Sequence, residues 1–228
     1  MGMMYGFIYE GTYKYEDFDK AGDTYTLKRN VPYFSSESNT QPGMPKYADL
    51  NDDGIIDDND RTMIGNGMPK HTGGFTNNFE YKGFDLSIFF QWSYGNDVLN
   101  ANRLFFENSN KTRDLNQYAS YADRWTPENP ESNIPRATDS GSNKVFSTRI
   151  IEDGSFLRLK TVSLGYTLPK QLTKKWKIDN ARVFVAGQNL WTCTGYSGYD
   201  PEVSIREGAL TPGLDFSAYP RAYSISLV

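Results

Sequence analysis

The segment Phe84–Tyr94 constrains the fold more than any other part of this sequence. Its apolar residues stand at every second position, and the residues between them are polar or small apart from Phe89; the apolar set is Phe84, Leu86, Ile88, Phe90, Trp92 and Tyr94. A side-chain period of two predicts a β-strand with one apolar and one polar face. The run greatly exceeds a typical strand of about 5 or 6 residues. Its length and its terminal aromatics are typical of a tilted membrane crossing.

The residues before this segment predict its hairpin partner. Residues 75–81 also alternate between apolar and polar side chains, and the two-residue link Lys82-Gly83 separates the two runs. Two long runs joined by such a short link are expected to form a β-hairpin. Residues 218–228 alternate again, and we expect one more strand there.

Residues 155–169 predict a further strand. One face is expected to carry Val162, Leu164, Tyr166 and Leu168, and the other Leu159, Thr161, Ser163, Gly165 and Thr167. Arg158 and Lys160 share the parity of the apolar face but stand at the start of the strand. If the strand descends from the outside, both cations fall above the hydrocarbon layer.

The connections between these strands differ in length. A further strand is expected at 181–193, but which of its faces is apolar stays open. Phe184 and Val185 are both apolar and adjacent, so alternation would place them on opposite faces. Shorter elements are expected as a strand at 3–14, a hairpin at 24–31 and a helical turn at 100–110. Short links at 82–83 and 169–180 alternate with long loops at 97–153 and 194–217. Short turns on one side and long loops opposite are typical of membrane β-barrels.

Composition excludes several classes of protein. The formal net charge is −4, which argues against a nucleic-acid partner. The single cysteine, Cys193, allows no internal disulfide. No run of about 18 apolar residues predicts a transmembrane helix, whereas barrel strands conceal their hydrophobicity in alternation. The first residues do not resemble a signal peptide, so we expect the chain to be a piece of a longer protein.

These features predict an all-β fold, namely an antiparallel transmembrane β-barrel segment with long extracellular loops. The chain offers five or six strands, whereas a closed transmembrane barrel needs at least about eight. The segment alone would keep two open edges. We therefore expect it to be the terminal part of a larger barrel.

Seven runs of residues resemble one known family, in the family's order and near its spacing. They are YADLNDDGIIDDNDRTMIGN, YKGFDLSIFFQWSYGNDV, RWTPENPESNIPRA, DGSFLRLKTVSLGYTLP, GQNLWT, GYDPEV and YPRA. The family is the SusC/RagA family of TonB-linked outer-membrane transporters of Bacteroidetes-type bacteria. The resemblance covers nearly the whole chain.

The resemblance implies a barrel of about 22 strands, of which residues 1–228 form the C-terminal part. Residues 1–70 would be loop-rich, and residues 71–228 would supply barrel strands and long loops. The plug domain and the TonB box are absent from these residues, so energy coupling would belong to the whole protein. The family pattern ends on an aromatic residue, whereas this chain ends Ser226-Leu227-Val228.

The resemblance also implies a function and partners. Family members lie in the cell outer membrane of Gram-negative bacteria and import glycans or peptides. Proton-motive force reaches them through TonB, and a SusD-like surface lipoprotein covers them. The partners would therefore be TonB, this lipoprotein, the glycan or peptide substrate and the lipid bilayer.

The acidic segment at 49–60 has the residue spacing of a twelve-residue calcium loop. The candidate ligands are Asp49, Asn51, Asp53, Ile55 through its carbonyl, Asp57 and Asp60, and Gly54 stands at the position of the sharp turn. Alternate residues of a turning backbone can converge their oxygens on one hard cation. The alternative is an acidic turn whose Asp and Asn side chains cap the backbone.

No catalytic constellation emerges, and we expect no enzyme. His71 is the only histidine, which rules out histidine clusters and leaves no choice of general base. Carboxylates such as Glu107 and Glu152 are expected in solvated loops. The aromatics Phe105, Phe106, Tyr118, Tyr121 and Trp125 could stack on sugars, but packing within the loop is the favoured interpretation.

One alternative function remains from the sequence alone. A soluble, calcium-stabilised β-sandwich that binds polysaccharide would also show alternation, acidity and a calcium loop. It requires that both sheet edges and the long loops fit within one compact domain.

Overall fold

A computed structural model describes residues 2–108, 116–138, 145–202 and 211–227. The chain divides into two compact units built from segments that are distant in sequence. Unit 1 comprises Met1–Gly67, Val98–Ile151 and Ser204–Ser217, and unit 2 comprises Met68–Asp97, Glu152–Val203 and Ala218–Val228. The sequence division at residue 70 lies close to the first passage between units, and the chain then returns to unit 1 at Val98.

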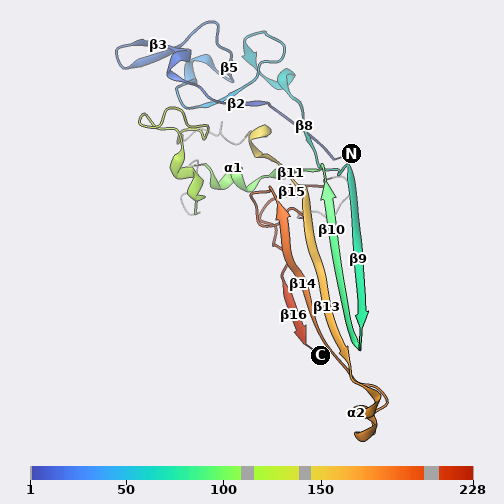
Figure 1. Ribbon diagram of the computed structural model, residues 1–228. Helices are drawn as coiled ribbons and strands as arrows, with labels where there is room; N and C mark the ends of the chain where they lie inside the picture. The colour runs from blue at the N-terminus through green and yellow to red at the C-terminus, as the bar shows by residue number, and fades with distance from the viewer. Residues whose placement is uncertain (1, 109–115, 139–144, 203–210, 228) are drawn as a thin grey trace. The chain divides into compact units, whose positions relative to one another are not determined.

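A five-stranded antiparallel sheet forms unit 2 (Figure 1). Its order is β16-β14-β13-β10-β9, with β9 His71–Tyr81, β10 Phe84–Tyr94, β13 Phe156–Thr167, β14 Arg182–Thr194 and β16 Ser224–Leu227. The four long strands contain 11, 11, 12 and 13 residues. Each is long enough for a tilted membrane crossing of about 9 to 11 residues. The all-β antiparallel prediction is confirmed.

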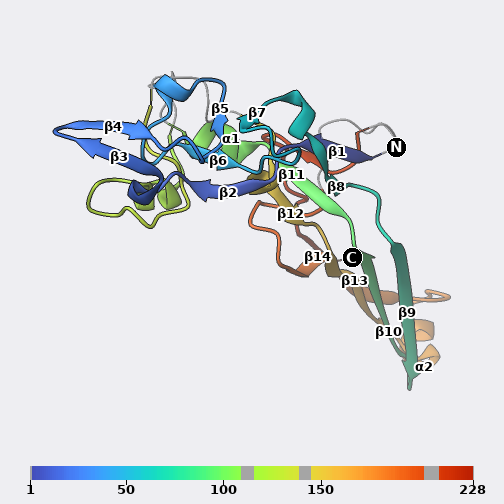
Figure 2. The same cartoon turned by 90° about the horizontal axis from the view of Figure 1, so that it is seen from above.

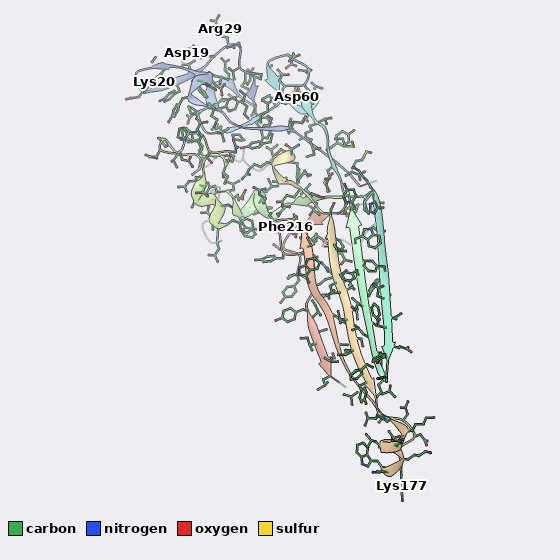
Figure 3. The ribbon with its side chains drawn as sticks, viewed as in Figure 1. Asp19, Lys20, Arg29, Asp60, Lys177 and Phe216 are labelled. Carbon is green, nitrogen blue, oxygen red and sulfur yellow. The ribbon has the colours of Figure 1, made fainter. Side chains whose placement is uncertain are left out.

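The connections of this sheet alternate in length as the sequence predicted. Lys82 and Gly83 turn the β9–β10 hairpin with φ of 47° and 86°, the left-handed values that a two-residue type I′ turn requires. The β13–β14 link contains the short helix α2 (Lys170–Lys175) and leaves the same end of the sheet (Figure 1). Lys177 lies in this link (Figure 3). The β10–β13 and β14–β16 connections leave the opposite end.

One face of the sheet is apolar across four strands. Two rows of apolar residues pair across β9, β10, β13 and β14. One row is Phe79, Leu86, Leu164 and Val185, and the other is Tyr81, Phe84, Tyr166 and Val183. The rings of Phe84 and Tyr166 lie 4.5 Å apart, and those of Phe75 and Phe90 stack at 4.9 Å. β16 extends this face, because Ile225 and Leu227 pair with Gly187 and Val185. Cross-strand pairs of this kind stabilise the sheet and fix its register.

A β-bulge corrects the predicted facing at the start of β13. Leu159 pairs with Phe90 and Thr161 with Phe89, so that Lys160 is an extra residue between them. One inserted residue inverts the side-chain parity of the strand before it. The prediction that Leu159 faces away from Val162 is therefore wrong, as is the apolar parity of Arg158 and Lys160. Leu157 and Leu159 belong to the apolar face, and Arg158 belongs to the polar face.

The register also settles the facing of β14. Val183 and Val185 pair with Tyr166 and Leu164 on the apolar face, whereas Phe184 pairs with Gly165 on the polar face. The Arg182 guanidinium lies 5.0 Å from the centre of the Phe184 ring. Phe184 thus fills space beside a glycine and supports a cation, which explains an aromatic side chain on the polar face.

Unit 1 consists of short elements rather than one sheet (Figure 2). Its strand pairs are β1 Met3–Gly6 with β8 Thr62–Asn66, β2 Tyr9–Thr12 with β6 Pro45–Tyr47, β3 Phe18–Ala21 with β4 Thr24–Leu27, β5 Tyr33–Phe34 with β7 Ile55–Ile56, and β11 Asp97–Asn100 with β15 Leu214–Asp215. β12 (Ile151–Asp153) lies where the chain leaves unit 1. Helix α1 spans Asn102–Phe106, which confirms the helical turn predicted there.

Single-turn helices and two apolar clusters complete unit 1. The turns are Tyr15–Asp17, Glu37–Asn39, Asp58–Asp60, Ala119–Asp123 and Thr148–Ile150. One cluster contains Phe7, Tyr47 and Ile56, and the other contains Tyr13, Phe18 and Leu27. None of the helices in the described residues is long and apolar enough to cross a membrane.

Two predictions for the N-terminal part are wrong in their boundaries. Residues 3–14 form two strands, β1 and β2, with different partners, instead of one strand. The predicted hairpin at 24–31 is the β3–β4 hairpin, which begins at Phe18 and bears Asp19 and Lys20 (Figure 3). Gly6 ends β1 where its backbone approaches the carbonyl of Phe146, and a side chain there would collide with it.

Candidate functional site

The polar face of the unit 2 sheet is the candidate functional surface. It carries Thr76, Asn78, Ser87, Gln91, Thr161, Ser163 and Gln188, which alternate in register with the apolar face. Phe89 is the aromatic exception on β10, and its ring lies over Gly74, where a side chain would collide with it. Small hydroxyl and amide side chains form a surface that water can wet.

An ion pair closes this face near the short links. Arg182 on β14 donates two hydrogen bonds to Asp85 on β10, and the distance from Nε to Oδ1 is 2.9 Å. The pair spans Gly165 on the intervening strand β13, and a β-carbon at this glycine would meet both side chains. Glycine is therefore required at this position, because the salt bridge passes directly over the backbone.

A larger ionic network lies at the opposite end of the polar face. Arg158 donates from Nη2 to Asp200 at 2.5 Å and from Nη1 to Glu202 at 3.1 Å. Lys160 and Arg221 also contact Glu202, at 3.6 and 3.1 Å. Three cations thus meet two carboxylates, and the network fastens the β14–β16 connection to strand β13.

Burial makes the central pair of this network the critical one. Arg158 is 2% exposed and Asp200 is 4% exposed. Burial alone would raise the pKa of Asp200, but the hydrogen bond from Arg158 and the backbone N–H groups of Glu202 and Arg221 hold it below its usual value. Asp200 is therefore charged at neutral pH, and its buried charge is stabilised by the opposite charge of Arg158.

The network was not predicted from the sequence, although three of the runs that resemble the family form it. Arg158 and Lys160 come from the run at 153–169, Asp200 and Glu202 from GYDPEV, and Arg221 from YPRA. Val203 of the second run lies outside the described residues. The runs converge because the Lys160 bulge turns Arg158 to the polar face, and the parity of the strand alone could not reveal that turn.

The acidic loop is folded around its own backbone. Asp60 is fully buried and accepts hydrogen bonds from the N–H groups of Leu50 and Asp57, both at 2.8 Å; its place in unit 1 is labelled in Figure 3. Asp49 accepts from Gly54 at 2.8 Å, and Asp53 accepts from Ile55 at 2.8 Å. The remaining candidates, Asn51 and Asp57, accept from Asp53 and Asn59.

Two observations concern the possible calcium ligands of this loop. In the described part of the chain, no group of three or more His, Cys, Asp or Glu side chains is arranged to hold a metal ion. The Oδ1 atom of Asp49 is buried and has no hydrogen-bond partner there. The calcium site at Asp49, Asn51, Asp53, Ile55, Asp57 and Asp60 stays a prediction.

The other candidate residues have structural roles. His71, the first residue of β9, accepts a hydrogen bond from the Trp92 indole at 3.1 Å and stacks on Tyr94. Tyr121 and Trp125 are buried, which supports the packing interpretation. Glu107 is 4% exposed and accepts from Arg149 at 2.6 Å, so the expectation of a solvated carboxylate is wrong there.

We predict that Arg158→Met destabilises the full-length protein by about 3 to 5 kcal/mol, because it leaves Asp200 buried without its cation. Arg221→Met is the matched control, since its half-exposed side chain makes a pair worth about 1 kcal/mol or less. Denaturant unfolding of the two variants in lipid vesicles measures the difference. Equal losses would contradict the central role of Arg158.

The same network predicts a dependence on acid. Because the pKa of Asp200 is lowered on folding, its stabilisation is complete above the unfolded pKa of about 3.9 and is lost as pH falls below it. Arg158→Met should therefore lose less stability than the wild type between neutral pH and acid. Parallel pH profiles of unfolding free energy would contradict this assignment.

Comparisons with known proteins place these observations in a family. No family model matches the chain. TonB-dependent receptor P3 of Formosa agariphila is 34% identical over 234 residues, which cover 100% of this chain and 22% of the relative. TonB-dependent receptor SusC of Bacteroides thetaiotaomicron is 27% identical over 192 residues, covering 84% of this chain and 18% of the relative.

Solved structures agree with these relatives. A structure of the RagAB peptide transporter matches 99% of this chain and 22% of its own with a TM-score of 0.70 and 25% identity. The RagAB peptide importer in its closed-closed state matches 98% of this chain and 22% of its own with a TM-score of 0.71 and 26% identity. The chain spans about a fifth of the length of the curated relatives that it matches. These relatives are named receptors or transporters, and the chain belongs with them to the SusC/RagA family of TonB-dependent receptors.

Proposed function

We propose that this chain forms part of the wall of an outer-membrane importer that takes up glycans or peptides in a TonB-dependent manner. The apolar face of the unit 2 sheet contacts the acyl chains of the bilayer. The polar face lines the aqueous interior of the barrel. The proteins that resemble the chain are named TonB-dependent receptors, and the RagAB relative is named a peptide transporter.

The observation that carries this proposal is the exposure of the apolar face. Phe79 is 56% exposed, Val183 51% and Ile225 70%, although all three lie on the apolar face. Within the described residues, the long strands of unit 2 form one sheet. A water-soluble sandwich would bury this face against another sheet, so the sandwich alternative is not favoured.

The edges of the sheet support a larger barrel. In the described residues, β9 pairs only with β10, and β16 pairs only with β14. Each outer strand therefore offers a row of unpaired backbone groups, which a lipid environment does not tolerate. Further strands of the full-length receptor would pair with both edges and close the barrel.

The connections support an orientation in the membrane. Membrane barrels of bacteria have short turns on the periplasmic side and long loops outside. The Lys82-Gly83 turn and the α2 link then face the periplasm, and the β10–β13 and β14–β16 connections begin on the outer side. A SusD-like lipoprotein would bind on the outer side, and TonB would act from the periplasm through parts of the receptor beyond these residues.

Calcium is our proposal for the acidic loop at 49–60. The support is the residue spacing of a calcium loop and the buried, unpaired Oδ1 of Asp49. Binding is expected in the range of about 0.1 to 1 mM, as for extracellular modules. The ion would staple the loop that precedes β8.

The calcium proposal is tested on the full-length receptor by titrating calcium chloride into chelator-treated protein and following thermal unfolding. We expect a rise in melting temperature that Asp53→Asn weakens, because this change removes a ligand charge but keeps an acceptor for Ile55 N–H. Asp58→Asn is the control, since Asp58 is exposed and pairs only with Arg61 in the described residues. No calcium response, or an equal effect of both variants, would overturn the site.

The membrane register is tested by a pair of arginine substitutions in the full-length receptor. Ile88→Arg on the apolar face should cost about 2 to 4 kcal/mol near the bilayer midplane, whereas Ser87→Arg on the polar face should be much milder. Denaturant unfolding in vesicles measures both. Equal penalties would contradict the assignment of the two faces.

A further inference from the structure

Unit 1 contains a cleft that none of the roles described above uses. Its volume is about 450 Å³, and its lining includes Tyr15, Asp23, Tyr25, Gln41, Trp125 and Arg136. This volume lies in the range of ligand pockets, roughly 300 to 1,000 Å³. The cleft lies entirely within unit 1, so its geometry is independent of the barrel sheet.

Three aromatic side chains line this cleft and contact one another. The ring of Tyr15 lies 5.3 Å from that of Tyr25 and 5.5 Å from that of Trp125. Tyr25 comes from the β3–β4 hairpin and Tyr15 from the turn before it, while Trp125 comes from a segment 110 residues further along. The fold thus assembles an aromatic platform from separate parts of the chain.

The backbone around Trp125 is built to hold this platform. Gly43 has a φ of +82°, and a β-carbon there would collide with the indole ring. The Trp125 backbone N–H donates to the carbonyl of Ile134 at 2.8 Å. Arg136 lies 5.6 Å from the indole centre and donates to Gln41 Oε1 at 3.2 Å and to the Pro42 carbonyl at 3.1 Å. The aromatic and polar groups of the cleft are therefore pre-organised.

The chemistry of the lining favours an uncharged polyhydroxyl ligand. Asp23 and Arg136 are its charged residues, and their charges cancel. A neutral lining gives no electrostatic preference for the charged ends and side chains of peptides. The indole Nε1 of Trp125 is buried and has no hydrogen-bond partner among the described residues. Aromatic faces beside carboxylate, amide and guanidinium groups suit the apolar faces and hydroxyl rims of sugar rings.

We propose that this cleft is a binding site for a neutral oligosaccharide, which stacks on Tyr15 and Tyr25 and is held at its hydroxyl groups by Asp23 and Gln41. This proposal rests on the proposed importer function in one respect, namely that the receptor meets its substrate outside the cell. It adds a contact point for a glycan on unit 1. It also selects the glycan from the two substrate classes considered above.

The test is calorimetric titration of the purified full-length receptor in lauryldimethylamine oxide, a detergent without a sugar headgroup. The probes are maltohexaose, cellohexaose, laminarihexaose, xylohexaose and mannohexaose. We expect one of them to bind, and the Tyr15→Ala/Tyr25→Ala variant to weaken its Kd by about tenfold or more, the equivalent of about 1.4 kcal/mol. Asp23→Ala removes an exposed hydrogen-bonding group, retains the aromatic platform and should weaken the Kd severalfold.

Tyr5→Ala is the matched control, because Tyr5 is an exposed tyrosine of unit 1 that does not line the cleft. Binding that survives both the double variant and Asp23→Ala, or binding of none of the five probes, would overturn the proposal. So would a tryptic digest of casein that binds wild type and loses affinity in the same variants. Uptake by cells is measured separately: uptake without cleft binding refutes this site alone, and cleft binding without uptake refutes the importer function alone.

Discussion

The apolar side chains that line one face of the unit 2 sheet are the constraint on which the rest of the structure depends. β9, β10, β13 and β14 bring these residues into register, so that each strand continues the face of its neighbour. Apolar surface that stays in water loses about 25 cal/mol of stabilising free energy per Å² compared with buried surface. A bilayer removes this cost without a second protein layer, which explains why a single sheet can carry so many exposed aromatic residues.

The polar face obeys the complementary rule. Its charged groups include the Asp85–Arg182 pair, with Glu80 opposite Asp85, at one end and the Arg158 network at the other, while small uncharged residues such as Ser87 and Ser163 occupy the middle. Pairing lowers the cost of holding charge against a low-dielectric wall. The network at the long-loop end also ties the β14–β16 connection to the sheet. The wall therefore combines a wettable surface with a fixed position for one of its long connections.

Much of this architecture could be predicted from local sequence, and the rest could not for identifiable reasons. Alternation and the Lys82-Gly83 turn are local signals, and they predicted the β9–β10 hairpin with its facing. The Lys160 bulge inverts parity with one residue and leaves no local signature, so Arg158 was assigned to the wrong face. The partners of Arg158 lie more than 40 residues away. The Tyr15, Tyr25 and Trp125 platform likewise joins distant segments, which only the folded chain brings together.

The most direct measurement is the accessibility of spin labels in the full-length receptor in lipid vesicles, at Leu86, Phe90 and Leu159 on the apolar face and at Thr161 on the polar face. The structure predicts that the first three labels relax with dissolved oxygen and are shielded from an aqueous nickel complex, while the label at Thr161 shows the reverse. Leu159 tests the bulge as well as the membrane contact. If the three labels were open to the aqueous reagent and shielded from oxygen, the apolar face would not contact lipid and the account would be contradicted.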